Sequence, residues 1–249
     1  MSGPTFTFAI LGHNEEELLG NALRQALAAA ERGDRVLFVD SASTDGPAGV
    51  ARSMGVEVLP APLGKGCALS VALEACESEY LCLLDADITE AELNIAAALR
   101  RAASELHVDM VVGQFWSRGV SVLPSTIGIY ARMIEAFFPE VSDRYGTRPL
   151  SGFRVLRPMS FPGLPGDFGV ESHLNIEVAL SGARAAVALE GVKRPTELAG
   201  DISGRLISGG ACGALARRHG LRITGPAFEC PRRPAADRLS AAGLLVRRA

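Results

Sequence analysis

Hydrophobic and polar residues alternate along the first half of the chain in a pattern typical of strands that are followed by helices. Short apolar runs predict buried strands, and the segments after them carry apolar residues at helical spacing. The expected strands are Thr5–Leu11, Val36–Val39, Val56–Leu59, Tyr80–Leu84 and Met110–Gly113. The expected helices are Glu16–Glu31 (with Leu18, Leu19, Leu23 and Leu27 on one face), a short helix ending at Met54, Cys67–Cys76 and Ala91–Leu106. This alternation indicates right-handed βαβ units around a parallel sheet, which is an α/β fold.

The regular pattern ends after residue 113. Residues 114–169 are richer in Pro, Gly, Arg and aromatic residues and show no clean period. Beyond them, the sequence predicts helices at Val170–Leu180, Ile207–His219 and Pro231–Ala249 and a strand at Ala185–Leu189. Because there is no internal repeat and no low-complexity linker, we expect a single domain over residues 1–249 whose two halves share one sheet.

Composition narrows the range of partners. The chain has 249 residues, 48% of them hydrophobic, and its net charge of -3 argues against broad binding to nucleic acid phosphates. It lacks an apolar run of about 20 residues that could span a membrane, and its N-terminus does not resemble a signal peptide. The five cysteines have no CxxC spacing, which fits reduced thiols. We expect a cytoplasmic protein, with membrane-surface contact by the arginine-rich C-terminal stretch left open.

Three polar clusters each follow a predicted strand. They are His13-Asn14-Glu15-Glu16, the segment from Asp40 to Gly46, and Asp85-Ala86-Asp87. In an open parallel sheet, ligands bind at the carboxyl ends of the strands, so the three clusters predict one shared site. The paired carboxylates of Asp85 and Asp87 suit a Mg²⁺-like ion that carries a phosphorylated ligand. The alternative for Asp87 is to cap a following helix.

Other residues near these strand ends have plausible structural roles. Ser43, Thr44 and Asp45 suit a turn and helix N-cap, and Glu16 suits the first turn of a helix. Gly64-Lys65-Gly66 precedes a helix, so its backbone could approach a ligand while Lys65 supplies positive charge. The spacing of this segment is not that of a P-loop.

These motifs, in this order, resemble those of GT-A glycosyltransferases of family 2. A narrower resemblance, over roughly residues 5–210, is to the group of glucosyl-3-phosphoglycerate synthases. It rests on Asp-Ser-x-Ser-Thr-Asp at 40–45, Ala131-Arg132 with Pro139-Glu140, Pro149-Leu150-Ser151-Gly152, Gly169-Val170-Glu171, and the segment from Lys193 to Leu198. The resemblance implies the GT-A fold, a Rossmann-like and mostly parallel sheet. Residues 1–113 would bind a nucleotide sugar, and residues 114–249 would bind the acceptor and include C-terminal helices.

The resemblance also implies an activity. A nucleotide-diphosphate sugar would donate glucose, with retained configuration, to a small and anionic hydroxyl acceptor, with Mg²⁺ or Mn²⁺ as cofactor and a homodimer as the possible assembly. The residues that it implies for the donor are Glu15, Asp40, Ser41, Gly64, Lys65 and Asp85. For the metal they are Asp87 and, as a substitute ligand, His173.

Further residues are implied for catalysis and for the acceptor. The backbone near Leu150 would stabilise an oxocarbenium-like centre, and Glu171 would hold acceptor hydroxyls. The residues implied for the acceptor are Ser125, Thr126, Arg148, Ser151 and Gly152. Arg154 is a further candidate for an anionic acceptor, because arginine forks match carboxylates and phosphates.

The chain departs from that group at two places. Leu123-Pro124-Ser125-Thr126 stands where the group has Gly-Arg-Val-Thr, so an acceptor-binding arginine is replaced. No histidine lies between Val187 and Thr196, where the group has a metal ligand. Both departures leave the acceptor and the metal shell open.

Three other functions remain as alternatives. The first is an inverting family-2 enzyme that acts on a lipid phosphate or a natural-product scaffold, in which Glu171 would be the general base. The second is a nucleotidyltransferase, although Leu11-Gly12-His13-Asn14 offers no cation after the first strand. The third is a sugar-nucleotide binder without catalytic activity.

Overall fold

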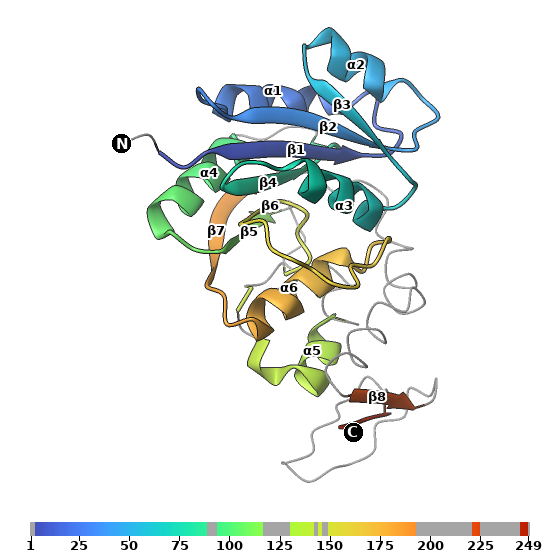
Figure 1. The fold of residues 1–249 in the computed structure, drawn as a ribbon, viewed down its shortest axis with the longest axis vertical. Helices are drawn as coiled ribbons and strands as arrows, with labels where there is room; N and C mark the ends of the chain where they lie inside the picture. The colour runs from blue at the N-terminus through green and yellow to red at the C-terminus, as the bar shows by residue number, and fades with distance from the viewer. Residues whose placement is uncertain are drawn as a thin grey trace.

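The central feature of the fold is a seven-stranded sheet (Figure 1). The computed structural model describes residues 3–88, 94–116, 130–141, 144–145, 149–192, 221–224 and 245–248. The strands of the sheet are β1 (Phe6–Gly12), β2 (Arg35–Ser41), β3 (Glu57–Ala61), β4 (Tyr80–Asp85), β5 (Met110–Trp116), β6 (Arg154–Leu156) and β7 (Ala185–Val192). The helices are α1 (Leu19–Ala29), α2 (Pro47–Ser53), α3 (Lys65–Ala75), α4 (Ile95–Leu106), α5 (Ala131–Phe137) and α6 (Val170–Leu180), with a 3₁₀ turn at Pro139–Val141.

The strand order is β3-β2-β1-β4-β6-β5-β7, and only β6 runs antiparallel to its neighbours. Strands β1, β2, β3 and β4 are parallel, as the alternating pattern predicted. Their register places Leu11 opposite Asp85 and Gly12 opposite Asp40. The carboxyl ends of β1, β2 and β4 therefore meet at the same edge of the sheet.

Both faces of the sheet are covered by apolar side chains. Phe6, Phe8 and Ile10 point from β1 into a core completed by α1 and α4, while Ala9 and Leu11 point into a second core with α3, α5 and α6. In Figure 1, α5 and α6 lie below the β1–β4 part of the sheet, on the side away from β3. Burial on both faces is why the strands are almost continuously apolar.

The expected α/β fold and mostly parallel sheet are confirmed, and both halves share that sheet. One detail of α1 was wrong. Leu19 and Leu23 are fully buried, but Leu27 is 41% exposed, because Ala22, Ala26 and Ala29 complete the buried face. In the described part of the chain, no helix is both long and apolar enough to cross a membrane.

The last described segments form a separate two-stranded ribbon. Strands β8 (Leu221–Thr224) and β9 (Leu245–Arg248) pair in antiparallel fashion. The expected C-terminal helix is therefore wrong for residues 245–248, which pair through main-chain hydrogen bonds with a segment more than twenty positions earlier. The helix expected at Ile207–His219 lies outside the described residues.

Candidate active site

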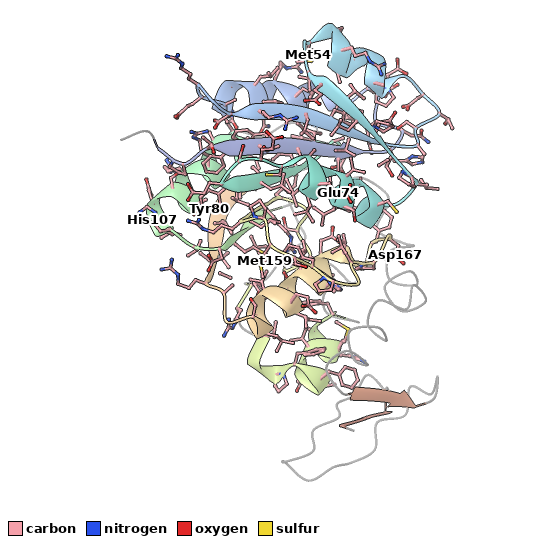
Figure 2. All side chains as sticks on the ribbon, viewed as in Figure 1. Met54, Glu74, Tyr80, His107, Met159 and Asp167 are labelled. Atoms are coloured by element: carbon pink, nitrogen blue, oxygen red, sulfur yellow. The ribbon has the colours of Figure 1, made fainter. Side chains whose placement is uncertain are left out.

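The candidate site lies at the edge where β1, β2 and β4 end. Figure 2 shows Asp167, in the loop before α6, on this side of the molecule, whereas Tyr80 and His107 lie at the opposite side. The N-terminal ends of α3 and α6 reach the same edge, because Lys65, the first residue of α3, forms ion pairs with Asp85 at the end of β4 and with Glu171 in the first turn of α6. The loops after the strands and the first turns of two helices thus meet at one edge of the sheet, and that they form one shared site stays a prediction.

The loops that follow β1 and β2 are joined by hydrogen bonds. The Nδ1 of His13 donates to the backbone oxygen of Ser41 at 2.7 Å, and the backbone NH of Asn14 donates to Ser43 Oγ at 2.9 Å. Asn14 Oδ1 accepts from the backbone NH of Thr44 at 2.7 Å. Asn14 has a φ of 56°, a left-handed conformation that asparagine adopts more readily than most residues. The two loops therefore form one wall of the site.

A second pair of bonds completes this wall. The backbone NH of Glu16 donates to Asp45 Oδ2, and the backbone NH of Gly46 donates to Glu16 Oε2, both at 3.0 Å. Glu16 and Asp45 therefore have structural roles, but not the ones that the sequence predicted. Helix α1 begins at Leu19 with no acidic residue in its first turn, and the N-cap of α2 is Gly46, so the two carboxylates bond across the two loops instead. Glu15 lies half-buried within this wall, and its backbone oxygen accepts from Leu19 at the start of α1. Donor contact by Glu15 stays a prediction.

Asp40 and Ser41, at the end of β2, organise nearby backbone. Asp40 Oδ1 accepts from the backbone NH of Ser43 at 3.1 Å. The hydroxyl of Ser41 donates to the backbone oxygen of Pro62 at 3.1 Å and accepts from the backbone NH of Gly64 at 2.9 Å. Ser41 thereby fixes the loop that leads into α3. Direct donor contacts by Asp40 and Ser41 stay predictions.

We predict that Ser41→Ala destabilises the protein by about 1–2 kcal/mol and raises the KM for a sugar-nucleotide donor, because the NH of Gly64 loses its partner. The measurements are urea unfolding and initial rates. Ser53→Ala is the matched control, since Ser53 is exposed and its hydroxyl donates to the backbone oxygen of Val50 in the same helix, α2. This control should change stability by no more than about 0.5 kcal/mol. Equal effects of the two substitutions would contradict the role given to Ser41.

Lys65 joins two carboxylates from different parts of the sequence. Its Nζ lies 2.8 Å from Asp85 Oδ1, at the end of β4, and 2.6 Å from Glu171 Oε1, in the first turn of α6. Burial disfavours the ammonium, but the charges of Asp85 and Glu171 outweigh that effect and hold the pKa of Lys65 above its ordinary value. Lys65 is therefore a permanent cation between two anions, in a setting where all three side chains are at most 22% exposed.

Glycines allow the backbone to approach this cluster closely. A methyl group on Gly152 would overlap both carboxylate oxygens of Asp85. A methyl group on Gly66 would overlap the backbone oxygen of Pro165, in the loop before α6. The NH of Cys67 donates to the backbone oxygen of Gly166 at 3.1 Å, so this loop also covers the start of α3. Glycine is thus required at positions 152 and 66 because neighbouring atoms leave no room for a side chain, and not because the backbone there must be flexible.

The segment Pro149–Gly152 leads into β6 beside Asp85. Leu150 and Ser151 are half-buried, and Ser151 Oγ accepts from the backbone NH of Phe153 at 3.3 Å. The structure therefore brings Leu150, Ser151 and Gly152 to the same edge as Asp85, Lys65 and Glu171. Their roles toward a substrate stay predictions. Ser125, Thr126 and Arg148 lie outside the described residues.

The two expected metal ligands come from separate elements. Asp87 is half-buried two residues beyond β4, whereas His173 is 2% exposed within α6. Across the described ranges, no three side chains of His, Cys, Asp or Glu gather closely enough to form a metal site. The part of Asp87 and His173 in metal binding stays a prediction.

Arg154 is the residue that sequence reasoning misplaced. Its side chain is fully buried, and so it is not available to an acceptor from solvent. Within the described residues it forms no ion pair; it bonds to Asn175 and to the backbone of Pro149 and Ser151. The signal that could have revealed this was its place in the otherwise apolar run Phe153–Leu156.

The fold and the converging strand ends are those of a nucleotide-sugar transferase. Residues 7–154, more than half of the chain, match the model of Glycosyl transferase family 2. The chain belongs to glycosyl transferase family 2, and it is therefore a glycosyltransferase that uses a nucleotide-sugar donor. The resemblance seen in the motifs is confirmed at this level.

Solved structures confirm the fold. Glucosyl-3-phosphoglycerate synthase from Mycobacterium tuberculosis, in complex with Mn²⁺, UDP-glucose and phosphoglyceric acid, superposes with a TM-score of 0.71 at 22% identity, covering 85% of this chain and 80% of that chain. Mannosyl-3-phosphoglycerate synthase from Rubrobacter xylanophilus superposes with a TM-score of 0.73 at 22% identity, covering 98% and 86%. No curated protein sequence matches this chain.

Proposed function

We propose that this protein transfers a hexose, glucose being the first candidate, from a nucleoside-diphosphate sugar to a small anionic hydroxyl acceptor with retention of configuration. The observation that carries the proposal is the Asp85–Lys65–Glu171 cluster at the carboxyl end of β4, with Gly152 against Asp85. A solved structure of the same fold contains UDP-glucose and phosphoglyceric acid, which supports this choice of donor and acceptor.

The cluster favours a binding role for Glu171. One oxygen of its carboxylate lies 2.6 Å from the Lys65 ammonium and so is already engaged in an ion pair, and its side chain is only 8% exposed. A general base needs access to the proton that it removes. Glu171 is therefore better suited to hold sugar or acceptor hydroxyls than to act as the base of an inverting enzyme. In a retaining front-face reaction, the departing diphosphate itself accepts the proton of the acceptor hydroxyl.

The two carboxylates at the end of β4 are suitable ligands for Mg²⁺ or Mn²⁺. Asp85 and Asp87 supply two carboxylates, and ions of this type commonly take one or two carboxylates and complete their shell with water and phosphate oxygens. The absence of a three-ligand cluster in the described residues agrees with such a shell. Structures of the same fold contain Mn²⁺ or Mg²⁺ with UDP. The ion would neutralise charge on the departing diphosphate.

We predict that one sugar nucleotide, with Mg²⁺ or Mn²⁺, raises the melting temperature, because a ligand that binds only the native state stabilises it by mass action. The panel contains UDP-, GDP- and ADP-sugars, each with metal and with EDTA. The donor that binds is then incubated with 3-phosphoglycerate and with other small hydroxy acids, and the anomeric configuration of the product is read by NMR. The axial anomer from an α-linked donor would establish retention.

Two results would contradict the proposed function. Folded protein that binds none of the donors, or a product with inverted configuration, would overturn it. Light scattering during size-exclusion chromatography tests the further expectation of a homodimer, and fractionation of cells tests the cytoplasmic location.

A further inference from the structure

Arg154, the first residue of β6, is a buried charged residue that contacts the Pro149–Gly152 segment of the candidate site. Its guanidinium makes three hydrogen bonds to oxygen atoms: Nε to the backbone oxygen of Ser151 at 2.7 Å, Nη2 to that of Pro149 at 2.5 Å, and Nη1 to Asn175 Oδ1 at 2.6 Å. Nη1 also donates to the sulfur of Met110 at 3.7 Å. Two of the four residues in the Pro149–Gly152 segment are thus held by one side chain. The planar fork of arginine fixes the directions of these bonds.

Asn175, which is bonded to Arg154, also holds this segment. Its Nδ2 donates to the backbone oxygen of Pro149 at 2.8 Å and to Tyr130 Oη at 2.9 Å. Tyr145 Oη donates to the backbone oxygen of Asn175 at 2.8 Å, and burial raises the pKa of Tyr145 to about 12, so its hydroxyl stays protonated. Asn175 is fully buried in α6 and lies four residues, or about one helical turn, after Glu171. The helix that supplies Glu171 to the site therefore also fixes the segment beside it.

Stability alone gives little reason for this arrangement. A buried cation without a paired carboxylate is costly, and burial lowers the pKa of Arg154, an effect that the charges of Glu171 and Asp85 partly offset. Buried ionic groups can often be replaced by well-packed apolar residues without loss of stability. What an apolar pair could not do is hold the carbonyl groups of Pro149 and Ser151 in fixed positions.

The position of this segment matters because of Gly152. Its Cα lies against the Asp85 carboxylate so closely that a single added methyl group would overlap both oxygens. Asp85 is bonded in turn to Lys65, and Lys65 to Glu171. A shift of the Pro149–Gly152 segment would therefore move the side chains that we propose to bind the substrates. A displacement of about 1 Å from productive geometry can lower a rate by about a hundredfold.

We propose that Arg154 and Asn175 are positioning residues, a buried clamp that sets the Pro149–Gly152 segment against the Asp85–Lys65–Glu171 cluster and so holds the donor sugar in its reactive position. The inference rests on the proposed function for the identity of the substrate. Neither residue touches the substrate. The clamp acts through the backbone oxygens of Pro149 and Ser151.

The test compares Arg154→Met, Asn175→Leu and the double variant with the wild-type protein. The double variant removes the cation and its amide partner together, and we expect it to fold and to bind UDP with Mn²⁺ within about threefold of wild type. Its kcat should fall by about a hundredfold, with a smaller change in the KM for the donor. Hydrogen exchange of the amides of Ser151 and Gly152 should be at least tenfold faster, which is a readout that does not depend on activity.

Two further variants make the result decisive. Arg154→Lys keeps a buried cation but cannot bond to three acceptors in one plane, so its kcat should also fall; if the double variant does not fold, this variant carries the test. Arg157→Met is the matched control, because Arg157 bonds to Tyr80 Oη and Glu79 near the start of β4, at the opposite end of that strand from Asp85. It should leave kcat and the exchange of Ser151 and Gly152 unchanged.

The outcomes separate the two proposals. Wild-type protein that turns over no donor overturns the proposed function, whereas the exchange rates still report on the clamp. Active wild type together with folded Arg154→Lys and double variants of nearly wild-type kcat and exchange overturns the clamp alone. A loss of melting temperature with unchanged kcat and unchanged exchange would show that Arg154 serves stability only.

Discussion

Replacing Gly152 with alanine is expected to lower the rate of sugar transfer sharply while leaving most of the fold intact. The added methyl group would overlap both oxygens of the Asp85 carboxylate, and so either the Pro149–Gly152 segment or Asp85 must move. Because Asp85 bonds to Lys65 at 2.8 Å, the displacement reaches the ion pair with Glu171. We expect kcat/KM to fall by about a hundredfold or more, measured by release of nucleoside diphosphate from the donor.

The matched control is Gly49→Ala. Gly49 is exposed in α2, and a methyl group there would contact nothing within 4 Å. This control should keep full activity. Because alanine has a higher helix propensity than glycine, it should also gain about 0.5–1 kcal/mol of stability. Overpacking in Gly152→Ala should cost about 1–3 kcal/mol, measured by urea unfolding. Wild-type kcat/KM in Gly152→Ala would show that the contact with Asp85 is irrelevant to transfer.

The part of the fold that the sequence predicted well is the part governed by local pattern. Strands β1 and β4 are buried on both faces, so their runs are apolar except for Thr7 in β1. His13 follows the end of β1, and Asp85 ends β4. Helix α6 begins and ends where its pattern predicted, at Val170 and Leu180. The polar clusters could be joined into one site because the carboxyl ends of parallel strands share an edge.

What could not be predicted depends on contacts between distant segments. Strand β6 has only three residues, and its insertion between β4 and β5 follows from pairing with both neighbours rather than from its own pattern. Arg154 was expected to face an acceptor, since a charged residue is rarely buried, yet Asn175 and two carbonyl groups accept its bonds inside the protein. The pairing of Lys65 with Glu171, 106 positions apart, has no local signal either.

Lys65→Met is expected to have the second large effect, and this one extends to stability. The substitution leaves Asp85 and Glu171 at most 22% exposed and without their shared cation. Removing one partner of a buried ion pair commonly costs about 3–5 kcal/mol, so we expect a loss near the lower end of that range. Transfer should fall by about a hundredfold to a thousandfold, which is the usual cost of removing one hydrogen-bond donor that stabilises negative charge in a transition state.

A double-mutant cycle with Glu171→Gln separates charge from packing. If the stability loss arises from unpaired carboxylates, the variant that combines Lys65→Met with Glu171→Gln should be at least about 1 kcal/mol more stable than Lys65→Met alone.

Because the pKa of Lys65 is raised, the ammonium should stabilise the wild-type fold throughout neutral pH and lose that effect only above the ordinary lysine value of about 10.4. Urea unfolding of wild type and Lys65→Met at pH 6, 7.5 and 9 should therefore show a nearly constant difference. A difference that vanished by pH 9 would mean that Lys65 is not held as a cation by Asp85 and Glu171.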